Sequence, residues 1–388
     1  MGLIVRFPLG GMAWHYLQYV MGLRRLGHDV LYIEDSDDFP GCYDPLRFTT
    51  DSDPSYGLRF THATFKRLGL DKDWAYWDAH GGEWRGGLGE KRREAIFDDV
   101  DMLINVSLSN PIRDWALKVP LRLAIDTDPV FTQIRNLSHP ARREATSRHT
   151  HFFTFGERWG APGSTMPDDG FGWLPTRQPI VLEAWPTTEP PRGGRFTTVM
   201  QWDSYPSRVY NGVRYEMKAR SFEKVMGLPT MVTAELELAL GGTNAPRQRL
   251  LEHGWRLENP LGITRDPWTF RSYVRSSAGE FSVCKHGYVT SRCGWFSERS
   301  ANYLASGRPV IVEETGFSDW LPTGLGVLPF STAEEAAQAV ETVRGDLSVH
   351  GRAARDLAQE YFDAGRVLGD LTEAALGGQG NAVKSEGG

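Results

Sequence analysis

Cationic and hydroxyl side chains gather in the segment from Gly279 to Gly316, which reads GEFSVCKHGYVTSRCGWFSERSANYLASGRPVIVEETG. Lys285 and Arg292 follow an apolar run that predicts a buried strand, and a helix is predicted to open at Ser297. The first turn of a helix has unpaired N–H groups and a partial positive charge, so it favours bound phosphate. We therefore expect a diphosphate here, held by Lys285, Arg292, Ser297, Glu298, Arg299 and Ser300.

Two candidate bases lie in the first half of the chain. His15 falls on the first turn of a helix predicted to start after Gly10 and Gly11, and its side chain has a pKa near neutral in water. Asp128 directly follows a predicted strand, so it could orient His15 or act as the base itself. Glu157 is a third candidate at the end of a later strand. These residues predict proton transfer from an acceptor group.

No metal site is expected. The cysteines Cys42, Cys284 and Cys293 form no CxxC pair, and His149 and His151 have no acidic or cysteine partner placed near them. The run Asp126, Thr127, Asp128 leaves a Mg²⁺ site as an alternative. We expect the cations Lys285, Arg292 and Arg299 to stabilise the leaving phosphate in place of a metal.

The elements that must position these side chains follow an α/β pattern. Short apolar runs alternate with helical periodicity, which predicts parallel sheets with candidate groups at the carboxyl edge. Strands are predicted at Leu3–Phe7, Asp29–Glu34, Asp101–Val106, Leu121–Ile125, His151–Phe155, Phe196–Trp202, Met231–Leu238 and Phe281–Cys284. The aromatic region from Cys42 to Gly87 lacks a clear period, so loops and short helices are predicted there.

The length of 388 residues favours two domains. A Pro- and Gly-rich segment after Glu183 predicts a linker near Pro190. We expect an N-terminal acceptor-binding domain over residues 1–190 and a C-terminal donor-binding domain over 191–360. A helix over 361–376 and a disordered polar tail over 377–388 complete the prediction.

Composition narrows the class of function. The net charge of −6 gives no general attraction for nucleic acid or for anionic membranes. No stretch approaches the roughly 20 apolar residues that span a bilayer, and the N-terminus has no signal-peptide pattern, so we expect a cytoplasmic protein. Homodimerisation is left open.

The segment from Gly279 to Gly316, with its turn Ser306-Gly307-Arg308-Pro309-Val310, resembles the donor-binding half of GT-B glycosyltransferases. The resemblance implies two Rossmann-like domains facing across a cleft and transfer of a sugar from a nucleotide-sugar co-substrate, without another cofactor. The acceptor would be a small molecule, such as a specialised metabolite, or a glycan. It also implies that Gly10, Gly11, Trp202 and Glu314 contact the donor. Where retaining relatives carry a ribose-binding glutamate, this chain has Asn302, and Glu298 is the acidic residue nearby.

Two other classes of enzyme remain open. An NAD-dependent oxidoreductase would use Glu34 or Asp35, at the end of the second predicted strand, to bind a ribose. The chain lacks its GxGxxG fingerprint, and Trp14 would crowd a dinucleotide. A sugar-nucleotide epimerase of GT-B fold would bind the same donor without an acceptor.

Overall fold

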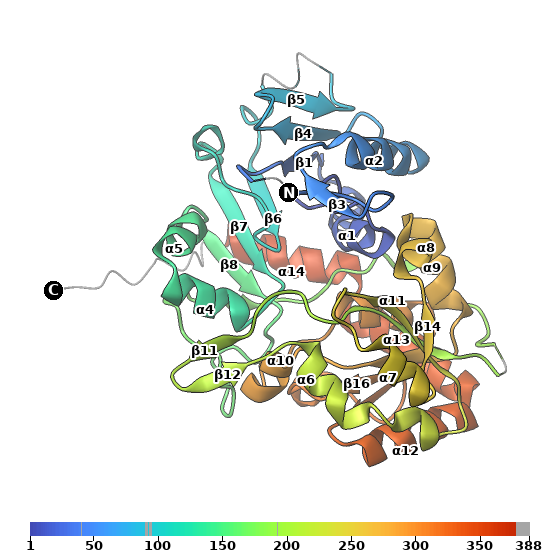
Figure 1. Cartoon of the computed structure of the whole chain (residues 1–388). Coiled ribbons are helices and arrows are strands. Elements are labelled where there is room, and N and C mark those ends of the chain that lie inside the picture. The colour runs from blue at the N-terminus through green and yellow to red at the C-terminus, as the bar shows by residue number, and fades with distance from the viewer. Residues whose placement is uncertain (40, 90–91, 93–94, 192, 378–388) are drawn as a thin grey trace.

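The computed structural model describes residues 1–39, 41–89, 92, 95–191 and 193–377. They form two α/β halves that pack against each other, one built mainly from the first part of the chain and the other from the second (Figure 1). The predicted α/β class is confirmed. Within these residues no helix is both long and apolar enough to cross a membrane.

The first half contains two small sheets with the strand orders β1-β4-β5 and β6-β7-β8-β9. All their pairs are parallel except β4 with β5. Met1 and Gly2 link the sheets, because Met1 O accepts from Val106 N at 3.1 Å and Gly2 N donates to Ile33 O at 3.3 Å. The strands are β1 Tyr32–Asp35, β4 Trp74–Asp78, β5 Glu83–Gly86, β6 Met102–Val106, β7 Leu121–Asp126, β8 His151–Thr154 and β9 Leu174–Pro175, beside a separate hairpin of β2 Cys42–Asp44 and β3 Thr49–Asp51.

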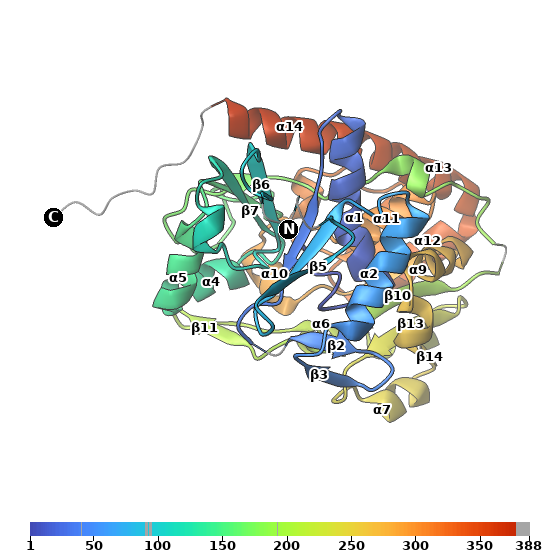
Figure 2. The ribbon, with the colours of Figure 1, turned by 90° about the horizontal axis from the view of Figure 1, so that it is seen from above.

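Helices flank these sheets: α1 Gly10–Arg25, α2 Ser55–Arg67, α4 Phe131–Ser138 and α5 Pro140–Ser147. Most of α1 is buried, because it lies between the first half and helices of the second half. Figure 2 shows α1 running beside the strands, with α11 and α9 on its other side. Helix α1 therefore brings the candidate residue His15 to the junction of the two halves.

The second half is built on a six-stranded sheet in which every pair is parallel. Its strands, in spatial order, are β14 Arg256–Glu258, β13 Leu236–Gly241, β10 Phe196–Gln201, β15 Gly279–Ser282, β16 Val310–Glu313 and β17 Val327–Phe330. A hairpin of β11 Arg208–Tyr210 and β12 Val213–Tyr215 extends from it. Its helices are α6 Lys218–Phe222, α7 Arg247–Glu252, α8 Pro260–Thr264, α9 Pro267–Ser276, α10 His286–Ser291, α11 Glu298–Ala305 and α12 Ala333–Gly345. Short 3-10 turns occur at Asp114–Ala116, Leu182–Ala184, Glu223–Val225, Leu228–Thr230 and Phe317–Asp319.

The chain then returns to the first half through α13 Leu347–Tyr361 and α14 Ala364–Leu376. Helix α14 packs on α1, where a side chain at Gly22 would come within 2.5 Å of Leu368 Cδ1 (Figure 2). Gly377 ends this helix, and residues 378–388 of the predicted tail lie outside the described residues.

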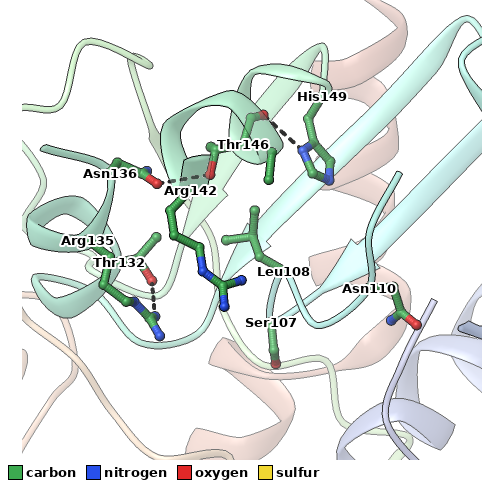
Figure 3. A pocket seen from close by; sticks show the side chains of 10 residues that line it. Ser107, Leu108, Asn110, Thr132, Arg135, Asn136, Arg142, Thr146 and His149 are labelled. Carbon is green, nitrogen blue, oxygen red and sulfur yellow. Dashed lines mark hydrogen bonds between the residues drawn. The ribbon is translucent and has the colours of Figure 1, made fainter. Parts of the chain in front are cut away.

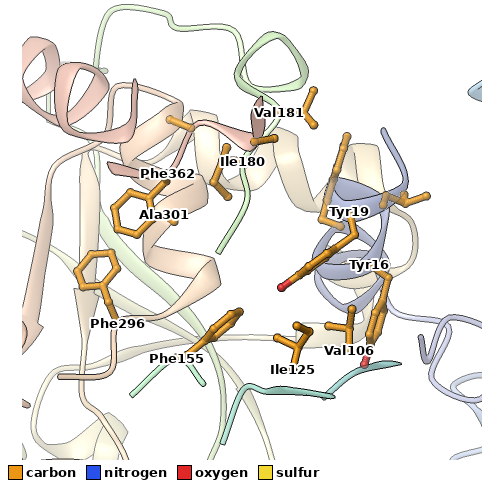
Figure 4. Packing of buried hydrophobic residues seen from close by; sticks show 14 of the residues in the cluster. Tyr16, Tyr19, Val106, Ile125, Phe155, Ile180, Val181, Phe296, Ala301 and Phe362 are labelled. Carbon is orange, nitrogen blue, oxygen red and sulfur yellow. The ribbon is translucent and has the colours of Figure 1, made fainter. Parts of the chain in front are cut away.

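One hydrophobic core crosses both halves. Figure 4 shows Tyr16 and Tyr19 of α1, Phe155 after β8, and Phe296 before α11 among its members. A second cluster fills the far face of the six-stranded sheet, and a third lies beneath β1 and β4. Because the core is continuous, the domain boundaries near residues 190 and 360 stay predictions.

Three local predictions differ from the structure. Leu3–Phe7 forms turns and no strand, because the N–H groups of Ile4, Val5 and Arg6 donate to the Glu34 carboxylate at 2.7–2.8 Å. The region from Cys42 to Gly87 contains four strands as well as α2, and β4 pairs with β1 in the sheet. Strand β4 is buried on both faces, so its sequence lacks the alternation of apolar and polar residues by which a half-exposed strand is predicted. The strand predicted from Met231 begins only at Leu236.

Candidate functional site

Helix α11 starts as the sequence predicts. Ser297 is extended and caps it, its hydroxyl accepting from Arg299 N at 3.2 Å, and Glu298 lies in the first turn. Gly307, at a φ of 68°, and the following Arg308-Pro309 turn the chain from α11 into β16. The amino end of α11 is thereby held beside the carboxyl ends of β15 and β16.

Lys218 lies at this helix end, on the first turn of α6. It forms no ion pair or hydrogen bond with the described residues, although it is half-buried and within electrostatic reach of Arg299, Lys285 and Glu298. Burial lowers its pKa to about 7, and the charges of Arg299 and Lys285 contribute to the decrease. A partly desolvated cation without a counter-ion is a site that a bound anion would stabilise.

Lys285 follows β15 and bridges the two halves. Its Nζ lies 2.7 Å from Asp128 Oδ1 and donates to Tyr205 Oη at 2.8 Å. Both tyrosines nearby, Tyr205 and Tyr288, donate their hydroxyls to the Asp128 carboxylate. Burial raises the pKa of Asp128, but the charges of Lys285 and Arg135 outweigh it and hold the pKa below its usual value. Asp128 is therefore an ionised partner of Lys285.

His15 occupies the facing side of the junction, on α1. Its Nε2 lies 3.3 Å from Ser107 Oγ, which accepts from Thr127 Oγ1 at 2.9 Å. Burial lowers the pKa of His15, against the opposing effect of the Glu298 carboxylate. His15 is therefore neutral at physiological pH. Within the described residues no hydrogen bond joins it to Asp128.

Other predicted donor residues have partners of their own. Arg299 donates to Glu280, to Ser282 and to Val199 O inside the sheet, so its charge is neutralised in the core. Arg292 is half exposed and lies 3.7 Å from Asp319. Trp202 is buried against Phe222, with their ring centroids 5.2 Å apart, as for a core residue. Arg299 and Arg292 are therefore already paired within the protein, unlike Lys218.

The remaining predicted donor residues are closer to the junction. Gly10 and Gly11 pack against α9, where a side chain at Gly10 would come within 2.2 Å of Asp266 O. Ser300 is fully buried, and its hydroxyl has no hydrogen-bond partner among the described residues. Glu314 accepts from Gly316 N in the loop after β16.

The other candidate acids, Asp126 and Glu157, also have partners within the protein. Asp126 is fully buried and accepts from Thr154 Oγ1 at 2.8 Å and from Gln133 Nε2 at 3.0 Å. Burial raises the pKa of Glu157, although Arg177 opposes the shift by pairing with it. In the described part of the chain, no cluster of three or more His, Cys, Asp or Glu side chains could hold a metal ion.

An NAD-dependent oxidoreductase would need Glu34 or Asp35 to bind a ribose, but both carboxylates already have partners within the protein. The Glu34 oxygens are taken by three backbone N–H groups and by Tyr32 Oη at 2.7 Å. Asp35 is fully buried and forms a bidentate pair with Arg113, with both distances 2.9 Å. Both carboxylates therefore stabilise the first half.

Sequence reasoning missed Lys218, Ser107 and the two tyrosines around Asp128. Lys218 lies on the short helix α6, and a single lysine there carries no local signal. Ser107 carried none, since its role depends on a non-glycine left-handed conformation with φ 65°. The tyrosines reach Asp128 from 77 and 160 residues away, which no local pattern indicates.

The chain matches no family model, and no curated protein matches its sequence. Solved structures are similar to it in fold. One, described as an α-glucosyltransferase in complex with UDP and a 13-mer DNA containing an HMU base, has 10% identity over 95% of this chain and 96% of that chain, with a TM-score of 0.50. A sucrose-phosphate synthase from Thermosynechococcus elongatus has 13% identity over 93% of both chains, with a TM-score of 0.48. HepE from Anabaena, in complex with UDP and glucose, has 11% identity over 82% of this chain and 89% of that chain, with a TM-score of 0.47.

These likenesses concern the fold. The α-glucosyltransferase, with a TM-score of 0.50, confirms the GT-B architecture of two Rossmann-like domains that face each other, as the resemblance in the segment from Gly279 to Gly316 implied.

Proposed function

We propose that this chain is a metal-independent glycosyltransferase that moves a sugar from a nucleotide-sugar to a small-molecule acceptor. The observation that carries the proposal is Lys218, which lies at the amino end of α11 without a counter-ion among the described residues. Desolvating a cation without a partner costs free energy, and a bound diphosphate would recover it. The GT-B fold adds support, since nucleotide-sugars are bound between the two domains in that architecture.

The donor side of the reaction needs stabilisation of the leaving group. As the bond between the sugar C1 and the diphosphate oxygen breaks, negative charge grows on the diphosphate. Lys218, Lys285 and the N–H groups of the first turn of α11 are placed to stabilise that charge. The carboxylate of Glu298, which has no hydrogen-bond partner among the described residues, is available to sugar or ribose hydroxyls.

The acceptor side needs removal of a proton. His15 is neutral, and its Nε2 contacts the Ser107 hydroxyl, which an acceptor hydroxyl would replace as hydrogen-bond partner. In the proposed step the acceptor oxygen bonds to C1, the nucleoside diphosphate leaves, and the acceptor proton passes to His15. Asp128 would then act through Lys285, since it is hydrogen-bonded to that lysine and not to His15.

Nucleotide binding is the first test. UDP, dTDP, GDP and NAD would be titrated against the purified protein in a thermal-shift assay, with and without EDTA. We expect one nucleoside diphosphate to raise the melting temperature equally in both conditions. At one hundred times its Kd, the ligand should increase the free energy of unfolding by about 2.7 kcal/mol. UDP is the first choice because the α-glucosyltransferase of similar fold was solved in complex with it. Stabilisation by NAD alone would overturn the proposal.

Product analysis separates transfer from the epimerase alternative. Incubation of the stabilising nucleotide's sugar conjugate with an acceptor mixture should release free nucleoside diphosphate and a glycosylated product. An epimerase would instead convert the sugar and leave the nucleotide attached, so that outcome would exclude transfer.

A further inference from the structure

A pocket of about 90 Å³ opens in the first half, between the end of β6 and helices α4 and α5 (Figure 3). No Asp or Glu side chain is among the residues that line it, which are Ser107, Leu108, Asn110, Thr132, Arg135, Asn136, Arg142, Ala145, Thr146 and His149. Its charged groups are therefore two arginines.

The polar side chains at the floor of the pocket, His149, Thr146 and Asn136, already have hydrogen-bond partners within the protein. His149 Nδ1 lies 2.9 Å from Thr146 O, and its Nε2 lies 3.0 Å from the amide nitrogen of Asn105. Since a carbonyl only accepts, the proton lies on Nδ1. Burial lowers the pKa of His149 to about 4, so the ring is neutral. Thr146 donates to Asn136 at 2.9 Å. These groups therefore bond to one another and are not available to a ligand.

The two arginines retain free donors. Arg142 is exposed on α5, and its guanidinium has no hydrogen bond or ion pair with the described residues. Arg135 donates one N–H to Thr132 at 3.1 Å and lies 3.5 Å from Asp128. Figure 3 shows both guanidinium groups pointing to the same side of the pocket, with Arg142 beside Leu108. Their remaining N–H groups suit a two-oxygen anion.

The loop after β6 adds backbone donors. Ser107 and Leu108 are consecutive left-handed residues, with φ values of 65° and 48°, although neither is glycine. Such a conformation costs on the order of 1 kcal/mol for each residue and persists where the surrounding structure holds it. The N–H groups of Leu108 and Ser109 have no acceptor among the described residues, so they too are available to a ligand.

We infer that this pocket binds an anionic group of the acceptor, a carboxylate or a phosphate monoester, through Arg142 and Arg135. The inference rests on the proposed function. A volume of about 90 Å³ has room for one such group. Ser107 forms one side of the pocket and also contacts His15, so an acceptor anchored here extends toward the proposed base.

The test compares neutral and anionic ligands that share one scaffold. Glucose, glucuronate and glucose 6-phosphate would be titrated calorimetrically against the full chain saturated with the nucleoside diphosphate that stabilises it. We expect at least one anionic sugar to bind and glucose not to. Arg142→Gln should weaken that binding about tenfold, whereas Arg59→Gln, which removes an exposed arginine from α2, should not. The better of the two anions identifies carboxylate or phosphate as the group.

The titrations distinguish failure of the anion pocket from failure of the proposed function. Equal binding of glucose and the anionic sugars, or unchanged binding in Arg142→Gln, would overturn the anion pocket. Anion binding that is lost in Lys218→Gln and kept in Arg142→Gln would place the anion at the diphosphate site, and would overturn it as well. If no nucleoside diphosphate binds, the titration is run without one. Arg142-dependent anion binding would then uphold the pocket while the proposed function fails.

Discussion

The ammonium group of Lys285 lies 2.7 Å from Oδ1 of Asp128, a contact between residues 157 positions apart that joins the two halves of the chain. Tyr205 and Tyr288 complete the same network by donating to the Asp128 carboxylate. Lys285 is thus held by an internal carboxylate, whereas Lys218 nearby has no such partner among the described residues. A bound diphosphate would meet one free lysine and one that must be shared with Asp128.

Asp128→Asn should weaken folding and strengthen nucleotide binding. Loss of a partly buried ion-pair partner costs about 3 kcal/mol of unfolding free energy, because Lys285 keeps its charge without a counter-ion. The same loss frees Lys285 for phosphate, so the Kd for the nucleoside diphosphate should fall. Urea unfolding and calorimetric titration measure the two effects.

A matched control for that change is Asp98→Asn. It removes the same charge from an exposed pair with Lys118, which contributes about 0–1 kcal/mol. If Asp128→Asn weakens nucleotide binding as much as Lys285→Gln does, the competition between Asp128 and phosphate is refuted.

Nucleotide affinity should depend on pH through Lys218. Its pKa of about 7 lies below that of a free lysine, so the unbound side chain loses its proton as the pH rises through about 7. Phosphate binds the charged form. Affinity should therefore be full below about pH 7 and fall above it, with proton uptake on binding. Calorimetry at about pH 6 and about pH 9, in buffers of different ionisation enthalpy, measures both.

Two substitutions sharpen this prediction. Lys218→Arg should bind nucleotide at about pH 9 as well as at about pH 6, since arginine stays protonated. Lys72→Gln, at an exposed turn, should keep the wild-type pH dependence. An affinity for the wild-type protein that is constant with pH would contradict the role of Lys218.

His15→Ala should impair turnover and spare donor binding. Removal of a general base typically lowers kcat by about 10²–10⁴-fold. Within the described part of the chain His15 makes one side-chain hydrogen bond, to Ser107, so the nucleotide site in the second half should stay intact. Initial rates and nucleotide titration are measured on one preparation, with His28→Ala, at an exposed position after α1, as the control. Retention of wild-type kcat would exclude His15 as the base.

Gly10→Ala and Gly11→Ala should differ, although both add one methyl group to the same helix. At Gly10 the methyl group would lie 2.2 Å from Asp266 O, so α1 and α9 must separate. At Gly11 it would lie 3.2 Å from a ring carbon of Phe270, which can shift slightly. Alanine gains about 0.5–1 kcal/mol over glycine in a helix. We expect Gly10→Ala to lower the melting temperature and Gly11→Ala to leave it nearly unchanged; the reverse order would contradict the packing.

The sequence alone determined the local elements of the candidate donor site. Ser297, Gly307 and Pro309 act through the backbone of their own residues, so their cap and turn signals predict α11 and its ends. The apolar runs likewise predict β6, β7, β8 and β15, because short parallel strands are apolar on both faces. These signals also carried the resemblance to the GT-B fold.

Tertiary structure decided which cations are free. Lys285, Arg292 and Arg299 are equivalent in the sequence, yet the folded chain gives each a different carboxylate, respectively Asp128, Asp319 and Glu280. It leaves Lys218 and Arg142 without one among the described residues. The physical reason is that an ion pair depends on distances of a few ångströms between residues far apart in the chain, and only the packing of both halves sets those distances.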